Sequence, residues 1–113
     1  MNKFEYFNSF YKYLYIAKVY GFNDLYKVGV TRSYKKRINS LVADTPIGFE
    51  FIAVFSGPNV YSKEQDFIHE FESHTFDISF PGCTEYIYIP ESVYNTLLNA
   101  DLLGYSLCHT WKP

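Results

Sequence analysis

Two different periods of apolar side chains run along the chain, separated by short breaks. Residues 13–19 alternate, with Tyr, Tyr, Ala and Val on one face and Leu, Ile and Lys on the other, which is the period of a strand. Residues 25–31 form a second strand-like segment. Residues 21–24 between them, a glycine followed by Phe, Asn and Asp, are typical of a turn. The pattern therefore predicts a β-hairpin over residues 13–31.

Helical spacing begins after the hairpin. An apolar stripe starts at Tyr34 and recurs four, seven and eight residues later, and Ser33 before it is a favoured N-cap residue. The sequence at residues 45–48, Thr-Pro-Ile-Gly, ends this helix. Residues 49–55, rich in Phe and Val, then predict a third strand.

The second half of the chain again changes between helix and strand. A capping-box sequence at residues 62–65 begins a helix that runs to about His74. Residues 84–89 predict a strand, and residues 90–103 a last helix. Residues 1–10 are aromatic and show no regular period. The predicted order is ββαβαβα, an α/β fold with a small mixed sheet flanked by helices.

Length and composition fit one intracellular domain. The chain has 113 residues, is 48% hydrophobic and contains 12 Tyr and 11 Phe, so we expect an aromatic-rich core. No apolar run approaches the roughly 18 residues of a membrane span, and residues 1–10 lack the layout of a signal peptide. We therefore expect a cytoplasmic protein without a membrane partner. Cys83, Cys108 and His109 do not have the spacing of a zinc site.

Charge is divided unevenly between the two halves of the chain. Residues 1–56 carry eight Lys and Arg against four acidic side chains, and residues 57–113 carry two against eight. A basic first half favours phosphate binding. The acidic second half could supply metal ligands or repel DNA, and the net charge of −2 argues against binding of long DNA by charge alone.

One ordered set of motifs points to a chemistry. Tyr-Leu-Tyr at residues 13–15 is followed by Tyr-Lys-Val-Gly-Val-Thr at residues 26–31, by Arg37 eight residues after that glycine, and by Glu64 and His69 on the second predicted helix. In this order the motifs resemble the GIY-YIG nuclease superfamily, and most closely its small phage-type branch with the pattern YKIGxT…R…E…H…EWF. The resemblance implies a three-stranded central sheet and a DNA-cleaving activity.

The resemblance covers residues 13–89 of a single domain that spans residues 1–113. The predicted helix and tail at residues 90–113 are left unexplained, and their apolar side chains fit either a core or an interaction surface. Glu85 falls in the position of the EWF motif, with Tyr and Ile after it. A structural role for this glutamate is as compatible with the sequence as a catalytic one.

The resemblance implies that Tyr15 positions or activates the attacking water. On the neighbouring strand, the chain departs from the usual motif. A phenol needs nearby cations to act as a base. Lys27 stands where most members of the superfamily have a second tyrosine, and could hold a phosphate or favour loss of the Tyr15 proton. Tyr26 is one residue away, on the opposite face of the strand, so it cannot replace that tyrosine unless a bulge intervenes. The alternative is that Tyr15 and Lys27 are ordinary strand residues.

Arg37 is the predicted phosphate-binding residue. Its guanidinium can hold a phosphate through two hydrogen bonds and stabilise charge that develops there. The alternative is a solvated basic turn. The neighbouring basic side chains expected to contact nucleic acid are Arg32, Lys35 and Lys36.

Glu64 is the predicted metal ligand. It lies within the apolar stripe of its helix, and an inward carboxylate needs a partner or a cation. The resemblance implies one divalent cation, Mg²⁺ or Mn²⁺, at this residue. The alternative is a first-turn glutamate favoured by the helix dipole. His69 lies five residues later, about 140° around the helix, and is expected to contact DNA or water rather than share the metal.

Two functions therefore remain open. One is a small metal-dependent DNA endonuclease with low intrinsic sequence specificity. The other is an inactive relative, a phage-type accessory or counter-defence module that binds a host protein, nucleic acid or a small ligand. Spare aromatic side chains are common in interfaces, so a homodimer is also compatible with the composition. An open cleft that brings Glu64 together with Tyr15 and Arg37 would favour the nuclease.

Overall fold

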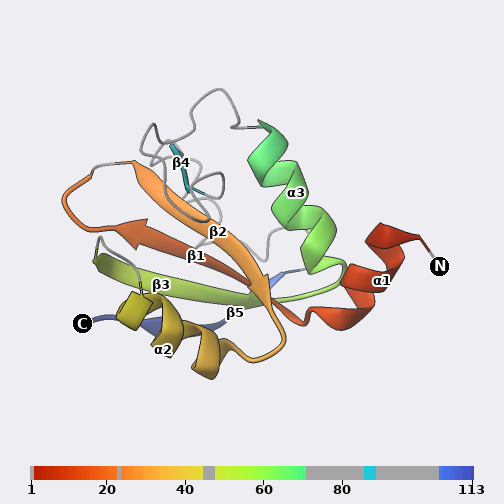
Figure 1. Cartoon of the computed structure of the whole chain (residues 1–113), viewed down its shortest axis with the longest axis horizontal. Helices are drawn as coiled ribbons and strands as arrows, with labels where there is room; N and C mark the ends of the chain where they lie inside the picture. Colours follow the sequence, from red (N-terminus) through yellow and green to blue (C-terminus); the bar gives the residue numbers. More distant parts are fainter. Residues whose placement is uncertain (1, 23, 45–47, 71–85, 89–104) are drawn as a thin grey trace.

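The computed structural model describes residues 2–22, 24–44, 48–70, 86–88 and 105–113. Helices and strands follow one another in the order α1, β1, β2, α2, β3, α3, β4 and β5 (Figure 1). Their bounds are Lys3–Phe10 for α1, Tyr13–Val19 for β1, Leu25–Thr31 for β2, Tyr34–Asp44 for α2, Phe49–Ser56 for β3, Val60–Glu70 for α3, Tyr86–Tyr88 for β4 and Ser106–Trp111 for β5.

Within the described residues, the strands form one five-stranded sheet in the order β4-β2-β1-β3-β5, and every neighbouring pair is antiparallel. The prediction of a mixed sheet was therefore wrong, whereas the three strands predicted for its centre are β2, β1 and β3, with β4 and β5 on either side of them. The predicted hairpin forms β1 and β2, and β3 pairs with the other edge of β1. Because β2 and β3 are both antiparallel to β1, they run in the same direction, but β1 lies between them. Helix α2 makes the crossover that joins them.

Both faces of the central strands are buried. Leu14 and Ile16 of β1 belong to the core under α3, whereas Tyr15 and Ala17 belong to the core under α2. Figure 1 shows α2 and α3 on opposite sides of the sheet. Side chains that alternate along β1 therefore enter two different environments. Among the residues that the structure describes, none of the helices has the length and apolar character needed to cross a membrane.

The N-terminal segment is a helix, which the sequence analysis missed. Asn2 is the N-cap of α1: its side-chain oxygen accepts the Glu5 N–H at 2.9 Å, and its amide donates to Oε1 of Glu5 at 3.2 Å. The Asn2 side chain therefore caps the helix at Glu5 N–H and also bonds to the Glu5 carboxylate, and asparagine is a favoured N-cap residue. A local signal for α1 is thus present in the sequence, although the helix has no buried residue.

Helix α3 begins two residues before the predicted cap. Asn59, with a φ of 54°, precedes it, so Ser62 lies in the first turn rather than at the N-cap. The Ser62 N–H is satisfied from outside the helix, because Oδ1 of Asn8 accepts it at 3.0 Å and Nδ2 of Asn8 donates to the Ser62 hydroxyl at 2.7 Å. These two bonds fix α1 against the start of α3.

The C-terminal tail adds a strand. Residues 106–111 pair with β3 and form an edge of the described sheet. The predicted strand at residues 84–89 is represented by β4, which pairs with β2. The predicted end of the second helix near His74, the glutamate at position 85 and the helix at residues 90–103 lie outside the described residues.

Candidate functional site

A cleft of about 800 Å³ lies between α2 and α3, at the end of β2. Strand β4 pairs with β2 only at Leu25–Lys27, so within the described part of the chain residues 28–31 of β2 have β1 as their only strand neighbour. Gly29, Val30 and Thr31 line the cleft along this edge. Helix α2 contributes from one side and α3 from the other, which makes the site a meeting point of elements far apart in sequence.

Tyr15 and Arg37 form the best-defined polar contact in the cleft. Nε and Nη2 of Arg37 donate to the phenol oxygen of Tyr15 at 3.2 and 3.1 Å, and the guanidinium lies 5.6 Å from the ring centroid. Only 2% of Tyr15 is exposed. A guanidinium has five N–H donors, and these bonds use two of them. The pair therefore fixes the phenol oxygen while Arg37 keeps donors that can be offered to a ligand.

Gly29 makes room for the Tyr15 ring. The two residues are direct partners in the antiparallel pairing of β1 with β2. A β-carbon at Gly29 would lie 2.7 Å from Cε1 of Tyr15, and closer still to Cζ and Oη. The tyrosine ring therefore crosses over the backbone of β2 toward the cleft, and glycine is required because any side chain would occupy the same space.

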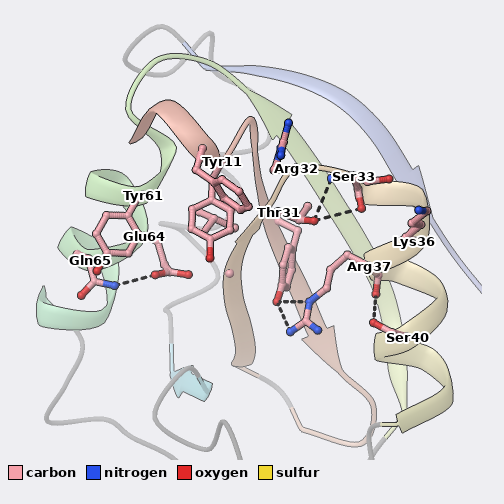
Figure 2. Close-up of a pocket in the computed structure, with 14 residues that line it drawn as sticks. Tyr11, Thr31, Arg32, Ser33, Lys36, Arg37, Ser40, Tyr61, Glu64 and Gln65 are labelled. Atoms are coloured by element: carbon pink, nitrogen blue, oxygen red, sulfur yellow. Dashed lines mark hydrogen bonds between the residues drawn. The ribbon is translucent and has the colours of Figure 1, made fainter. Parts of the chain in front are cut away.

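Glu64 enters the cleft from the opposite side. It lies on α3, is 6% exposed and lines the cleft, and its Oε1 accepts a 2.7 Å hydrogen bond from Nε2 of Gln65. Figure 2 shows Glu64 and Arg37 pointing into the cleft from facing sides. A buried carboxylate requires polar partners or a cation. The arrangement therefore places one negative and one positive group at the walls of the same cavity.

The entrance to α2 supplies further positive charge. Arg32 and Lys36 are exposed and line the cleft. The turn before the helix is held by Thr31, whose hydroxyl accepts the Ser33 N–H and donates to the Ser33 carbonyl, both at 3.1 Å. The Ser33 carbonyl in turn accepts the Arg37 N–H at 3.1 Å, as expected of an N-cap residue. This turn sets the direction in which the basic side chains leave α2.

The family model for the T5orf172 domain matches residues 12–100. The chain belongs to the T5orf172 domain family. This family is phage-associated and often linked to nucleases of the GIY-YIG and HNH kinds. No curated protein and no solved structure gives a significant match to the chain.

Not all the predicted site residues meet in the cleft of this T5orf172 domain. Lys27 is only 4% exposed, on the α2 face of the sheet, and it is not among the residues that line the cavity. His69 is exposed near the end of α3, and Lys35 is exposed on α2, both outside the cleft lining. Tyr26 belongs to the core under α3, on the opposite face from Tyr15, as its position in the strand predicts.

Other residues of the T5orf172 domain enter the cleft without having been predicted. Tyr61 and Gln65 lie next to Glu64 on α3, at spacings of three and one, so helical periodicity alone places Tyr61 on the same side. Phe10 and Tyr11 come from the end of α1 and the residue that follows it. With 23 Tyr and Phe in the sequence, composition alone does not show which aromatic side chains line the cleft.

Proposed function

We propose that this T5orf172 domain is a metal-dependent DNA endonuclease of the GIY-YIG type, which hydrolyses phosphodiester bonds with low intrinsic sequence specificity. The observation that carries the proposal is the convergence of Tyr15, Arg37 and Glu64 in one cleft from β1, α2 and α3. Such a hydrolysis needs three groups. The tyrosine positions the attacking water, the arginine binds the phosphate, and the carboxylate binds a cation.

Arg37 is the phosphate clamp in this proposal. Its guanidinium is held by Tyr15, so it does not have to be ordered when a phosphate arrives. Hydrogen bonds from a guanidinium to phosphate oxygens are charge-assisted and strengthen as negative charge builds up in the transition state. Arg32 and Lys36, exposed at the same cavity, would contact neighbouring phosphates of the backbone.

Tyr15 positions the attacking water. Its oxygen accepts two N–H groups of Arg37, which fixes the direction of its own hydroxyl group and stabilises negative charge that develops on the oxygen. The ring is locked by the close approach to Gly29. In its phenolate form, which the two Arg37 N–H groups stabilise, this oxygen would accept a proton from water as the water attacks phosphorus, and Tyr15 would become a neutral phenol.

The acidic wall fits a hard divalent cation with few protein ligands. Within the described residues, no three His, Cys, Asp or Glu side chains gather into a metal-binding group. Glu64 is the carboxylate among the described residues that line the cleft, and its oxygens are ligands of the type that Mg²⁺ and Mn²⁺ prefer. Mg²⁺ is commonly held by one or two carboxylates, with waters and substrate phosphates completing its shell. When bound, the cation supplies positive charge that allows a phosphate to approach this carboxylate.

A non-catalytic binding module is the second candidate, and one observation favours it. Lys27, in the position of the second tyrosine, is buried and does not line the cleft. A site without that group would bind a phosphate-containing ligand or a partner at the same basic wall without cutting it. Both candidate functions use the same cleft to bind the ligand, and they differ only in whether the bound ligand is cleaved.

DNA cleavage by purified protein decides between them. Supercoiled, branched and single-stranded DNA are incubated with Mg²⁺, Mn²⁺ or EDTA, and Glu64→Gln is compared with Asp66→Asn, an exposed carboxylate two residues along α3. Arg37→Gln is compared with Lys112→Gln near the C-terminus. We expect metal-dependent cutting that Glu64→Gln and Arg37→Gln abolish and the two controls retain. Absence of cutting on every substrate by folded protein would establish the binding module instead.

A further inference from the structure

Helix α1 presents aromatic side chains beside the cleft. Phe10 is 37% exposed and lines the cavity, and Tyr6, 53% exposed, stacks on it with an interplanar angle of 16° and a centroid distance of 6.1 Å. The guanidinium carbon of Arg32 lies 4.7 Å from the centroid of the Phe10 ring. We refer to Tyr6, Phe10 and Arg32 as the stacking cluster. It is a run of planar groups on the surface, in contact with one another.

The cluster is held in place from below. The side chain of Asn8 bonds to both the hydroxyl and the N–H of Ser62, and Phe7 packs on Tyr61 with ring centroids 4.9 Å apart. The Asn2 side chain caps the other end of α1. The exposure of Tyr6 and Phe10 is therefore a property of an anchored helix and not of a loose chain end.

We infer that the stacking cluster is a binding subsite for an unpaired DNA base next to the phosphate held at Arg37. Aromatic rings and arginine guanidinium planes are the groups on which unstacked bases lie, and such contacts tolerate any base because each has a π-face. In a regular duplex both faces of a base are covered by its neighbours. The subsite therefore selects single-stranded or locally unpaired DNA, and in naming this substrate it rests on the proposed function.

Charge favours DNA over a second copy of the chain as the occupant. Arg32 lies over the Phe10 ring and, like Lys36 and Arg37, lines the cleft beside it. Two copies joined through this surface about a two-fold axis would bring the same cations together, and like charges facing each other oppose association. A phosphodiester backbone has the complementary charge and carries flat apolar bases at the same time.

The test compares binding of fluorescently labelled single-stranded DNA with binding of the same strand containing abasic sites, in EDTA so that neither is cut. We expect the wild type to prefer the intact strand. Phe10→Leu, which keeps the residue apolar but removes the ring, lowers affinity for the intact strand roughly 5- to 100-fold and leaves the abasic strand unchanged. Phe10→Tyr retains the preference. Tyr20→Leu removes an exposed ring at the β1–β2 turn and serves as the matched control.

Tyr6→Leu and Arg32→Lys report on the other two members of the cluster, and Arg32→Lys keeps the charge while removing the plane. Each is expected to weaken the preference for the intact strand. The inference is overturned if the wild type binds intact and abasic strands equally, if it binds neither, or if Phe10→Leu affects both alike. It is also overturned if sedimentation shows a wild-type dimer that Phe10→Leu dissociates.

Cleavage measured in parallel separates this inference from the proposed function. If the protein prefers intact strands but cuts no DNA, the base-binding subsite is supported and the endonuclease proposal is contradicted. If it cuts DNA but binds intact and abasic strands equally, the endonuclease proposal is supported and the subsite is contradicted.

Discussion

The ring of Tyr15 lies over the backbone of Gly29, its direct partner across β1 and β2, and leaves no space for a side chain there. This contact places the phenol oxygen where Arg37 can donate two hydrogen bonds to it. The glycine of the strand motif is therefore a packing requirement of the neighbouring tyrosine. It controls the cleft through the position of Tyr15.

Gly29→Ala should consequently damage both stability and the site. A β-carbon 2.7 Å from Cε1 of Tyr15 must push the ring away or separate the strands. We expect a loss of about 1–3 kcal/mol in the free energy of unfolding, measured by urea denaturation, and loss of DNA cleavage. Gly48→Ala is the matched control, because a β-carbon there meets nothing closer than 4.0 Å. Equal stability of the two variants would contradict the packing argument.

Tyr15→Phe isolates the hydroxyl group from the ring. It removes the acceptor of two hydrogen bonds from a half-buried guanidinium, so we expect destabilisation of about 1–2 kcal/mol. DNA cleavage should fall at least about 100-fold if the phenol oxygen handles a proton, whereas DNA binding should change little. Tyr13→Phe, on the same strand, provides the control. Full cleavage by Tyr15→Phe would restrict Tyr15 to a structural role.

Asn8→Ala tests how α1 is attached. The substitution breaks both bonds to Ser62 and leaves a first-turn N–H of α3 without its side-chain acceptor. We expect a cost of about 1–2 kcal/mol and faster hydrogen exchange at the Ser62 amide. Because alanine is a better helix former than asparagine, the exposed Asn39 of α2 is replaced in parallel and its effect is subtracted. Unchanged exchange at Ser62 would show that aromatic packing alone holds α1.

Local sequence signals were sufficient where a segment forms its own contacts. The hairpin at β1 and β2, the start of α2 at Ser33 and the strand β3 all have the predicted positions, since alternation, turn residues and capping are short-range features. Strand β5 was not predicted, because its side chains are mostly exposed and its partner β3 lies some fifty residues earlier. Long-range pairing of this kind has no local signature.

In the cleft, too, some residues could be identified from the sequence, whereas the position of others depends on long-range strand pairing. Tyr15, Arg37 and Glu64, which the motif order singles out, all line the cleft. Lys27 does not line the cleft, because a residue two positions before Gly29 on β2 shares its face but lies farther along the strand, where β4 is paired. Motif spacing identifies the face of a strand, but how far the neighbouring strand extends decides which residues on that face reach the cavity.

The contact between the C-terminal tail and the start of α3 depends on pH, because it is made by the hydroxyl group of Tyr105. Its hydroxyl donates to the carbonyl oxygens of Pro58 and Asn59, just before that helix. Burial, and secondarily the charge of Asp66, raises the pKa of Tyr105 above its ordinary value of 10.0. The protonated form is thus favoured by folding, so its contribution is complete below about pH 10 and is lost as pH rises through the folded-state pKa.

Tyr105→Phe removes this contribution. We expect the wild type to exceed the variant by about 0.5–1 kcal/mol at neutral pH. The difference should shrink when thermal unfolding is followed from pH 8 to pH 11. A difference that stays constant over this range would show that the ring of Tyr105, and not its hydroxyl proton, stabilises the junction between the tail and α3.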